Sequence, residues 1–165
     1  MKELLLRICE YNAWANQRFI DVLSTVDAAI PDQEIISSFN SIRATVQHTW
    51  GAEDIWLQRL TQVPNPVWAG LHFKGDFHTL LDLWRKSSDG LTHFVKSLED
   101  PTAFSKILVV EHLNNERFHY EISAIIQHAC NHSSYHRGQL VTMMRQAGIK
   151  TIPGTDLSSF VRIPI

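Results

Sequence analysis

Apolar residues recur every three or four positions along most of this chain, and this spacing limits the fold more than any other feature. Residues one helical turn apart lie on the same face, so each such stretch predicts a helix with one buried face. We expect helices over residues 2–26, from about 37 to 60, from 76 to about 98 and from about 121 to 147. Four long amphipathic helices predict an all-α four-helix bundle.

Capping residues indicate where these helices begin and end. Ser37 or Ser38 is suited to cap the second helix, and Asp76 the third, because short polar side chains accept hydrogen bonds from free helical N–H groups. Gly148 is suited to end the fourth helix, since glycine readily takes the left-handed conformation found after many helices.

The link between the third and fourth predicted helices, residues 105–120, differs in kind. Runs of β-branched and aromatic residues flank Asn114 and Asn115, which are typical turn residues. This pattern predicts a small hairpin or an extended crossover. With 165 residues and 44% hydrophobic content, we expect residues 1–165 to form a single domain with the apolar tail packed on the bundle.

Charge and composition exclude several classes of protein. The formal net charge is -2 and no run of Lys or Arg occurs, so we expect no binding to nucleic acid. No apolar run approaches the ~20 residues that a membrane-spanning helix needs. Cys9 and Cys130 form no CxxC motif, and we expect them to be buried, reduced thiols of a cytoplasmic protein.

Histidine is the unusual residue of this chain, with nine copies. On the fourth predicted helix, His132 and His136 lie one turn apart, about 40° from each other around the helix axis. Ile125 and Met143 lie between them in angle, which turns this stripe toward the core. Two imidazoles at this spacing can point their nitrogens at one ion, as in helical His-x-x-x-His zinc sites.

A third histidine, His48, lies in the middle of the second predicted helix and could complete such a site from a facing helix. Three histidines would leave coordination positions open for water or substrate, as in catalytic zinc sites. The spacing also fits a structural bundle whose histidines only pack. His128, one turn before His132, could be a fourth ligand, a hydrogen-bonding neighbour of the ligands, or a buried packing residue.

Other ionisable residues can be weighed against the same site. Glu53, Asp54 and Glu121 could act near an open metal site as a general base, but such residues are more often solvated or orient a neighbour. The remaining histidines show no recurring spacing and are expected to be surface or packing residues: His72, His78, His93, His112 and His119.

Four stretches of the chain resemble the DinB/YfiT-like superfamily of four-helix proteins. Residues 131–139 read Asn-His-Ser-Ser-Tyr-His-Arg-Gly-Gln, which is similar to the NHxxxHRGQ signature of that superfamily. Residues 11–16, 47–57 and 153–157 are similar to its first helix, its second helix and its C-terminal segment. The resemblance spans nearly the whole chain and implies a bundle of the DinB/YfiT-like type.

At the candidate site, the resemblance implies that His48, His132 and His136 form the metal triad of the superfamily. It implies one divalent ion, zinc or nickel, and neutral imidazole suits both. It also implies a homodimer. The mycothiol-dependent isomerases of the superfamily differ at this site, since they typically carry Glu where His132 stands.

The resemblance leaves the reaction open. It favours a metal-dependent enzyme acting on a small molecule, either a low-molecular-weight-thiol S-transferase that uses mycothiol or bacillithiol, or a related transferase. A metal-dependent hydrolase is one alternative. A non-enzymatic metal-binding stress-response protein is another, and it would explain a triad with no evident acid or base beside it. No catalytic residue is predicted.

Overall fold

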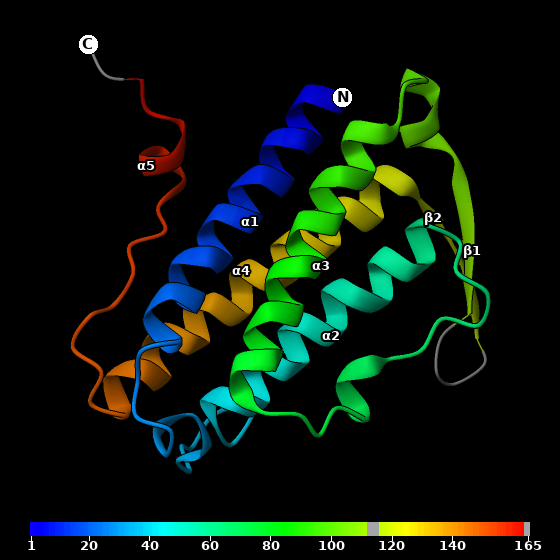
Figure 1. Ribbon diagram of the computed structural model, residues 1–165. Coiled ribbons are helices and arrows are strands. Elements are labelled where there is room, and N and C mark those ends of the chain that lie inside the picture. The colour runs from blue at the N-terminus through cyan, green and yellow to red at the C-terminus, as the bar shows by residue number, and fades with distance from the viewer. Residues whose placement is uncertain (112–115, 164–165) are drawn as a thin grey trace.

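The computed structural model describes residues 1–111 and 116–163. Four long helices dominate the structure (Figure 1): α1 (Lys2–Leu23), α2 (Ile42–Leu60), α3 (Phe77–Ser97) and α4 (Ile122–Gln146). Shorter elements join them: a hairpin of β1 (Ile107–Glu111) and β2 (Arg117–Glu121), a terminal helix α5 (Leu157–Val161), and 3-10 turns at Ile30–Asp32, Ala69–Leu71 and Pro101–Ser105.

The four long helices pack as a bundle, which confirms the predicted fold class. Both α1 and α2 pack against α3 and α4. The order around the bundle is therefore α1, α3, α2, α4, and the two helices joined by the hairpin lie diagonally across it. This arrangement places α2 directly against α4, the two helices that carry the candidate metal ligands.

The start of α2 corrects a prediction. Ser41 caps this helix, because its Oγ accepts a hydrogen bond from the Ala44 N–H at 3.1 Å. The prediction of Ser37 or Ser38 as the cap is wrong. The Ser38 hydroxyl instead accepts a hydrogen bond from Nε2 of Gln139 on α4, at 2.9 Å.

Other helix ends agree more closely with the sequence. Asp76 caps α3 and accepts a hydrogen bond from a first-turn N–H at 2.8 Å. Gly148 follows α4 with a φ of 80°, as a left-handed terminating residue should. However, α1 ends at Leu23, three residues before the predicted end at residue 26. Just after this end, the hydroxyls of Ser24 and Thr25 donate hydrogen bonds to carbonyls of the last turn of the helix.

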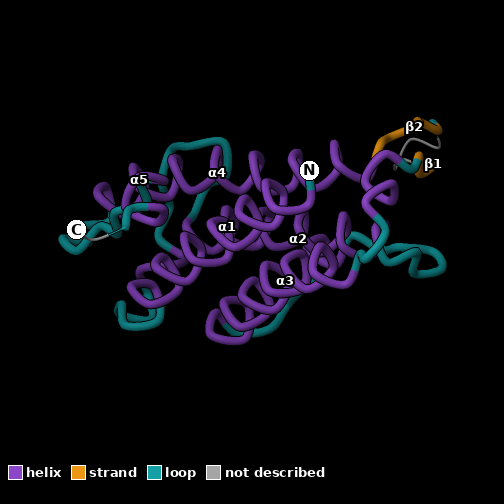
Figure 2. The backbone as a smooth tube through the Cα atoms, turned by 90° about the horizontal axis from the view of Figure 1, so that it is seen from above, coloured by secondary structure: helices purple, strands orange, loops and turns teal. Residues whose placement is uncertain are grey.

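The predicted hairpin is confirmed. β1 and β2 pair antiparallel, with Val109 opposite His119. The predicted turn at Asn114 and Asn115 lies outside the described residues. The hairpin stands at one end of the molecule, and α5 lies on the opposite side, beside α1 (Figures 1 and 2).

The C-terminal tail returns to the bundle, as predicted. The Tyr11 hydroxyl donates a hydrogen bond to the Thr155 carbonyl at 2.7 Å, and the Phe160 ring lies 5.4 Å from the ring of Trp14. Within the described ranges, none of the helices combines the length and apolar character that a bilayer-spanning segment requires.

The core consists of two apolar clusters separated by a polar layer. The cluster nearer the hairpin includes Trp56, Leu91 and Ile126, and the other includes Phe19 and Trp84. Burying side chains of this size contributes about 1.5–3 kcal/mol each. The polar layer between them brings all four long helices together and is described with the site below.

The two cysteines lie side by side in the first cluster. Cys9 and Cys130 are buried and free, with their sulfur atoms 3.9 Å apart. The hydrogen bond with the Cys9 thiol, and then burial, raises the pKa of Cys130 well above its ordinary value, which makes it a poor nucleophile. The prediction that both thiols are buried is confirmed.

Candidate metal centre

Three histidine side chains meet where α2 faces α4. Nε2 of His132 lies 3.2 Å from Nε2 of His48 and 3.1 Å from Nε2 of His136. One nitrogen from each ring falls within 4.8 Å of the other two, so the three residues could together hold a metal ion. The structure thus brings together the three residues singled out from the sequence.

The spacing of the nitrogens fits a shared cation. Two imidazole nitrogens bound to one zinc ion at 2.0–2.1 Å and at a tetrahedral angle would stand about 3.3 Å apart. The observed separations of 3.1 and 3.2 Å are close to that value. Imidazole nitrogens are suitable donors for both zinc and nickel.

Gln139 fixes which nitrogen of His136 carries the proton. Oε1 of Gln139 lies 2.7 Å from Nδ1 of His136. An amide oxygen only accepts hydrogen bonds, so the proton resides on Nδ1 and the lone pair on Nε2 faces His48 and His132. Ser38 holds the other end of the Gln139 amide. Partners of this kind orient the imidazoles of metal sites.

The electrostatics of the site keep the rings neutral. Burial, and then the proximity of His136, lowers the pKa of His48 and of His132 to about 4. Burial also lowers the pKa of His136. The rings are therefore unprotonated at neutral pH, with lone pairs free to bind a cation. Nδ1 of His132 is buried and has no hydrogen-bond partner among the described residues.

Two aromatic rings flank His48. Phe39 stacks on it with ring centroids 4.4 Å apart, and Trp68 lies 5.7 Å away. Phe39 was expected in the second helix, but it precedes the Ser41 cap and reaches the site from the loop. The Trp68 indole packs directly against two glycines. A Cβ at Gly51 would lie 2.7 Å from its Nε1 and a Cβ at Gly70 would lie 2.9 Å away, so a larger residue at either position would clash with the indole.

His128 does not lie on the buried face of α4, so the prediction of it as a buried packing residue is wrong. Ile125 and Met143 are buried as expected, but His128 is exposed. Four-residue steps turn about 40° each around a helix, so a stripe of this spacing winds toward solvent. The ring of His128 lies 5.8 Å from that of His132 and edge-on to Trp56. The three converging nitrogens meet without it.

Glu53 is fully buried and accepts hydrogen bonds from three other helices. Its Oε1 accepts from Nδ2 of Asn12 at 2.7 Å, from Nδ2 of Asn16 at 2.9 Å and from the Ser133 hydroxyl. Its Oε2 accepts from the Ser88 hydroxyl at 2.7 Å. The interpretation of Glu53 as a residue that orients its neighbours fits this geometry, and the solvated alternative does not.

Arg137 completes this buried group. Its Nη1 donates to Oδ1 of Asn12 and to Oδ1 of Asn16, at 2.6 Å each. We call the group the Glu53 cluster, and its members are Asn12, Asn16, Glu53, Ser88, Ser133 and Arg137. Because Ser133 and Arg137 directly follow the two histidines on α4, the Glu53 cluster fixes the rotation of the helix that carries them.

The Glu53 cluster was not predicted from the sequence. Its main signal is the pair Asn12 and Asn16, one turn apart on the buried face of α1, where polar residues need partners. A second signal is Arg137, a cation next to an inward-facing histidine. Neither signal indicates that the carboxylate of Glu53 accepts these hydrogen bonds.

The other candidate carboxylates lie elsewhere. Glu121 is exposed at the start of α4 and accepts from the Ser123 hydroxyl. Asp54 accepts from Gln58, and burial raises its pKa. Within the described structure, no hydrogen bond joins either residue to the three histidines. Four of the remaining histidines are exposed as predicted, and His112 lies outside the described residues: the four are His72, His78, His93 and His119.

The fold and the site define a four-helix bundle with a three-histidine group that could hold a metal. The sequence profile of the DinB family matches residues 1–163, and the chain belongs to this family. Protein DinB of Bacillus subtilis (strain 168) is 25% identical over 168 residues, which cover 98% of this chain and 95% of that protein. The resemblance stated from the sequence is confirmed.

A solved structure supports the same fold. The crystal structure of a DinB-like protein from Bacillus cereus ATCC 10987 superposes with a TM-score of 0.71 and covers 92% of this chain and 95% of that chain. At 22% sequence identity, this likeness concerns the fold alone.

Proposed function

We propose that this protein binds one divalent metal ion, zinc or nickel, through His48, His132 and His136. The observation that carries this proposal is the meeting of three Nε2 atoms, with neighbours 3.1 and 3.2 Å apart. Gln139 supports it, because it holds the proton of His136 on the nitrogen that faces away from the other two rings.

We further propose that the protein is an enzyme acting on a small molecule, a low-molecular-weight-thiol S-transferase or a related transferase. A hollow of about 240 Å³ adjoins His48 and is lined in part by Phe39 and Trp68. These rings shield one side of the site from water and leave room for a small ligand. A bound divalent ion would supply Lewis acidity, which acidifies a thiol or a water molecule.

Thiol transfer is favoured over hydrolysis by what surrounds the histidines. Among the candidate bases, Glu53 lies nearest to His48 along the chain. Its carboxylate already accepts hydrogen bonds from four side chains of the Glu53 cluster. A hydrolase would gain from a free carboxylate that moves protons to the leaving group, whereas an acidified thiol is a nucleophile without further help. A metal-dependent hydrolase is the second candidate.

A conjugation assay tests the proposed reaction. Metal-loaded protein is incubated with 1-chloro-2,4-dinitrobenzene and, in separate reactions, with bacillithiol, mycothiol, glutathione or cysteine. We expect conjugation above the uncatalysed rate with one of these thiols and none with His136→Ala. Turnover of esters or amides without any thiol would favour hydrolysis instead. No turnover in either assay would favour a metal-binding stress-response protein.

Assembly, location and domain organisation belong to the same proposal. We propose a cytoplasmic homodimer in which residues 1–165 form a single domain. The buried free thiols support a reducing compartment, and the homodimer rests on the resemblance to the superfamily. Light scattering on the purified protein measures the number of chains in the assembly.

A further inference from the structure

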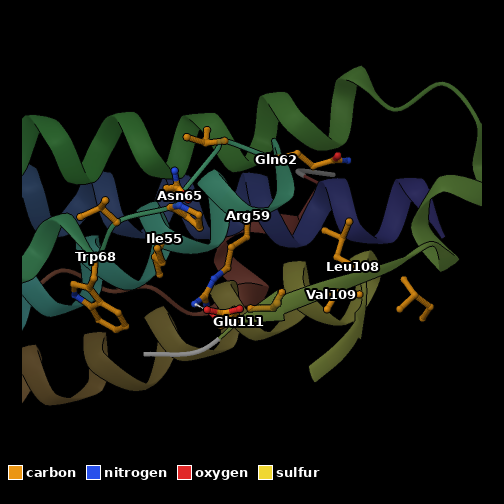
Figure 3. A pocket seen from close by; sticks show the side chains of 13 residues that line it. Ile55, Arg59, Gln62, Asn65, Trp68, Leu108, Val109 and Glu111 are labelled. Carbon is orange, nitrogen blue, oxygen red and sulfur yellow. Dashed lines mark hydrogen bonds between the residues drawn. The ribbon is translucent and has the colours of Figure 1, made fainter. Parts of the chain in front are cut away.

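A groove lies apart from the histidines, between the C-terminal half of α2, the loop over residues 62–68 and strand β1 (Figure 3). Its volume is about 800 Å³, within the usual range for small-molecule sites of about 300–1,000 Å³. Trp68 lines both this groove and the hollow beside His48. A ligand lying in the groove would therefore end at the wall of the candidate metal centre.

Arg59 is the only cation among the described residues that line the groove. Its side chain extends toward Glu111 on β1 (Figure 3), and its Nη2 donates to the Glu111 carbonyl at 3.3 Å. The guanidinium carbon lies 4.5 Å from the centre of the Trp56 ring. Its Nε is buried and has no hydrogen-bond partner within the described structure.

The charge of Arg59 is not balanced by a carboxylate of the described chain. The carboxylate of Glu111 pairs with Arg117 at 2.9 Å, and no ion pair in the described ranges includes Arg59. A half-buried guanidinium without a counter-ion is costly, because burial removes water from a charge. The same burial lowers the pKa of Arg59. An anion from outside would relieve this cost.

The walls of the groove are held in place. Gln58 clamps the loop through both of its amide atoms, since Nε2 donates to the Val67 carbonyl at 3.0 Å and Oε1 accepts from the Val67 N–H at 2.9 Å. Gln62 and Asn65 turn the same loop with positive φ angles of 55° and 53°. A preformed wall lowers the entropy lost when a ligand binds.

We propose that this groove binds a small organic carboxylate with an apolar body. The carboxylate pairs with Arg59, whose planar guanidinium matches two carboxylate oxygens. The body lies against Ile55, Val110 and Trp68. A single cation neutralises a single carboxylate, whereas a phosphate dianion would need further donors. That the bound molecule is also the substrate of the metal centre rests on the proposed function, but binding in the groove does not.

Binding of 4-phenylbutyrate tests this proposal, with 4-phenylbutanamide as its uncharged counterpart. Titrations are followed by calorimetry on the full chain, both metal-loaded and after chelation. We expect the acid to bind at least about tenfold more tightly than the amide, since a hydrogen bond to a charged group is lost with the amide. Arg59→Gln should weaken binding of the acid by a similar factor, and Arg59→Lys by less.

Arg18→Gln is the matched control. Arg18 also lies over a tryptophan, 5.3 Å from the ring of Trp14, and also donates to a backbone carbonyl, but it lies on α1. We expect this variant to bind as the wild type does. If Arg59→Gln does not fold, the difference between acid and amide on the wild type decides.

Three results would overturn the proposal: no binding of the acid, equal binding of acid and amide, or unchanged binding in Arg59→Gln. A dimer that disappears in Arg59→Gln would also overturn it, because the groove would then be covered by a second copy of the chain. If His136→Ala still binds the acid, binding in the groove does not depend on the metal centre. The two proposals can then fail independently of each other.

Discussion

The bundle contains two polar groups: the three histidines, which lie on α2 and α4, and the Glu53 cluster, which has members on all four long helices. The two groups differ in how their polar atoms are satisfied. In the Glu53 cluster, the carboxylate oxygens face N–H and O–H donors from Asn12, Asn16, Ser88 and Ser133. In the histidine group, nitrogen faces nitrogen. The first group is complete within the protein, whereas the second needs a shared proton or a cation.

The two groups also differ in how deeply they are buried. Glu53 is fully buried between the two apolar clusters, where it joins all four long helices. His48 and His132 are half-buried at the edge of the bundle, and a hollow that a small molecule could enter adjoins His48. We infer that the Glu53 cluster stabilises the scaffold and that the histidines carry the function.

The largest effect is expected from Glu53→Gln, which should lower the free energy of unfolding by about 3–5 kcal/mol. The new amide N–H group would face the N–H donors of Asn12 or Asn16, or the hydroxyl of Ser88. Urea unfolding of the metal-free protein measures the loss. Glu34→Gln, at an exposed position, should change it by no more than about 0.5 kcal/mol. Equal losses in the two variants would contradict a scaffold role for Glu53.

The next effect concerns stabilisation by metal. Zinc or nickel at about 100 times its Kd should raise the wild-type free energy of unfolding by about 2.7 kcal/mol, because only the native state presents the site. His132→Ala should lose this gain and still fold without metal. The exposed His93→Ala should keep it. A gain that survives in His132→Ala would show that the ion binds elsewhere.

A smaller effect is expected at Gln139. Gln139→Ala removes the oxygen that holds the proton on Nδ1 of His136, so metal affinity should fall about 10–100-fold. Gln139→Glu keeps an acceptor at this position and should retain affinity. Competition with a chromophoric chelator measures both, and Gln146→Ala at the exposed end of α4 is the control. Unchanged affinity in Gln139→Ala would remove Gln139 from the site.

The smallest effect is expected from pH, because half-exposed groups are screened by solvent. The pKa of His48 and of His132 is about 4 in the folded protein, against 6.5 for a free histidine. Between these values the unfolded chain binds more protons, so the metal-free protein should lose stability as pH falls from about 6.5 toward 4. Unfolding of His48→Ala/His132→Ala should show a shallower dependence on pH. An identical slope in this variant and the wild type would contradict the lowered values.

How far the sequence predicted the structure depends on the range of the interactions involved. The pairing of His132 with His136 follows from helical geometry, which is local. That His48 joins them depends on α2 packing against α4, and spacing alone left this open. The predicted cap of α2 was wrong by a few residues, because the Ser38 hydroxyl accepts a hydrogen bond from Gln139, which is distant in the sequence.

The remaining features could not be read from local patterns. The donors that surround Glu53 come from three other helices, so no spacing within α2 marks this residue as a hub. The environment of Arg59 likewise depends on where the hairpin packs against α2. Both features arise from contacts between segments that are distant in the sequence.

Counting the metal ions bound per chain tests the difference between the two polar groups most directly. Purified protein is loaded with zinc or nickel, desalted and analysed by inductively coupled plasma mass spectrometry. We predict one ion per chain in the wild type and in His93→Ala, and none in His136→Ala. A full complement in His136→Ala, or no ion bound by the wild type with either metal, would contradict the three-histidine site.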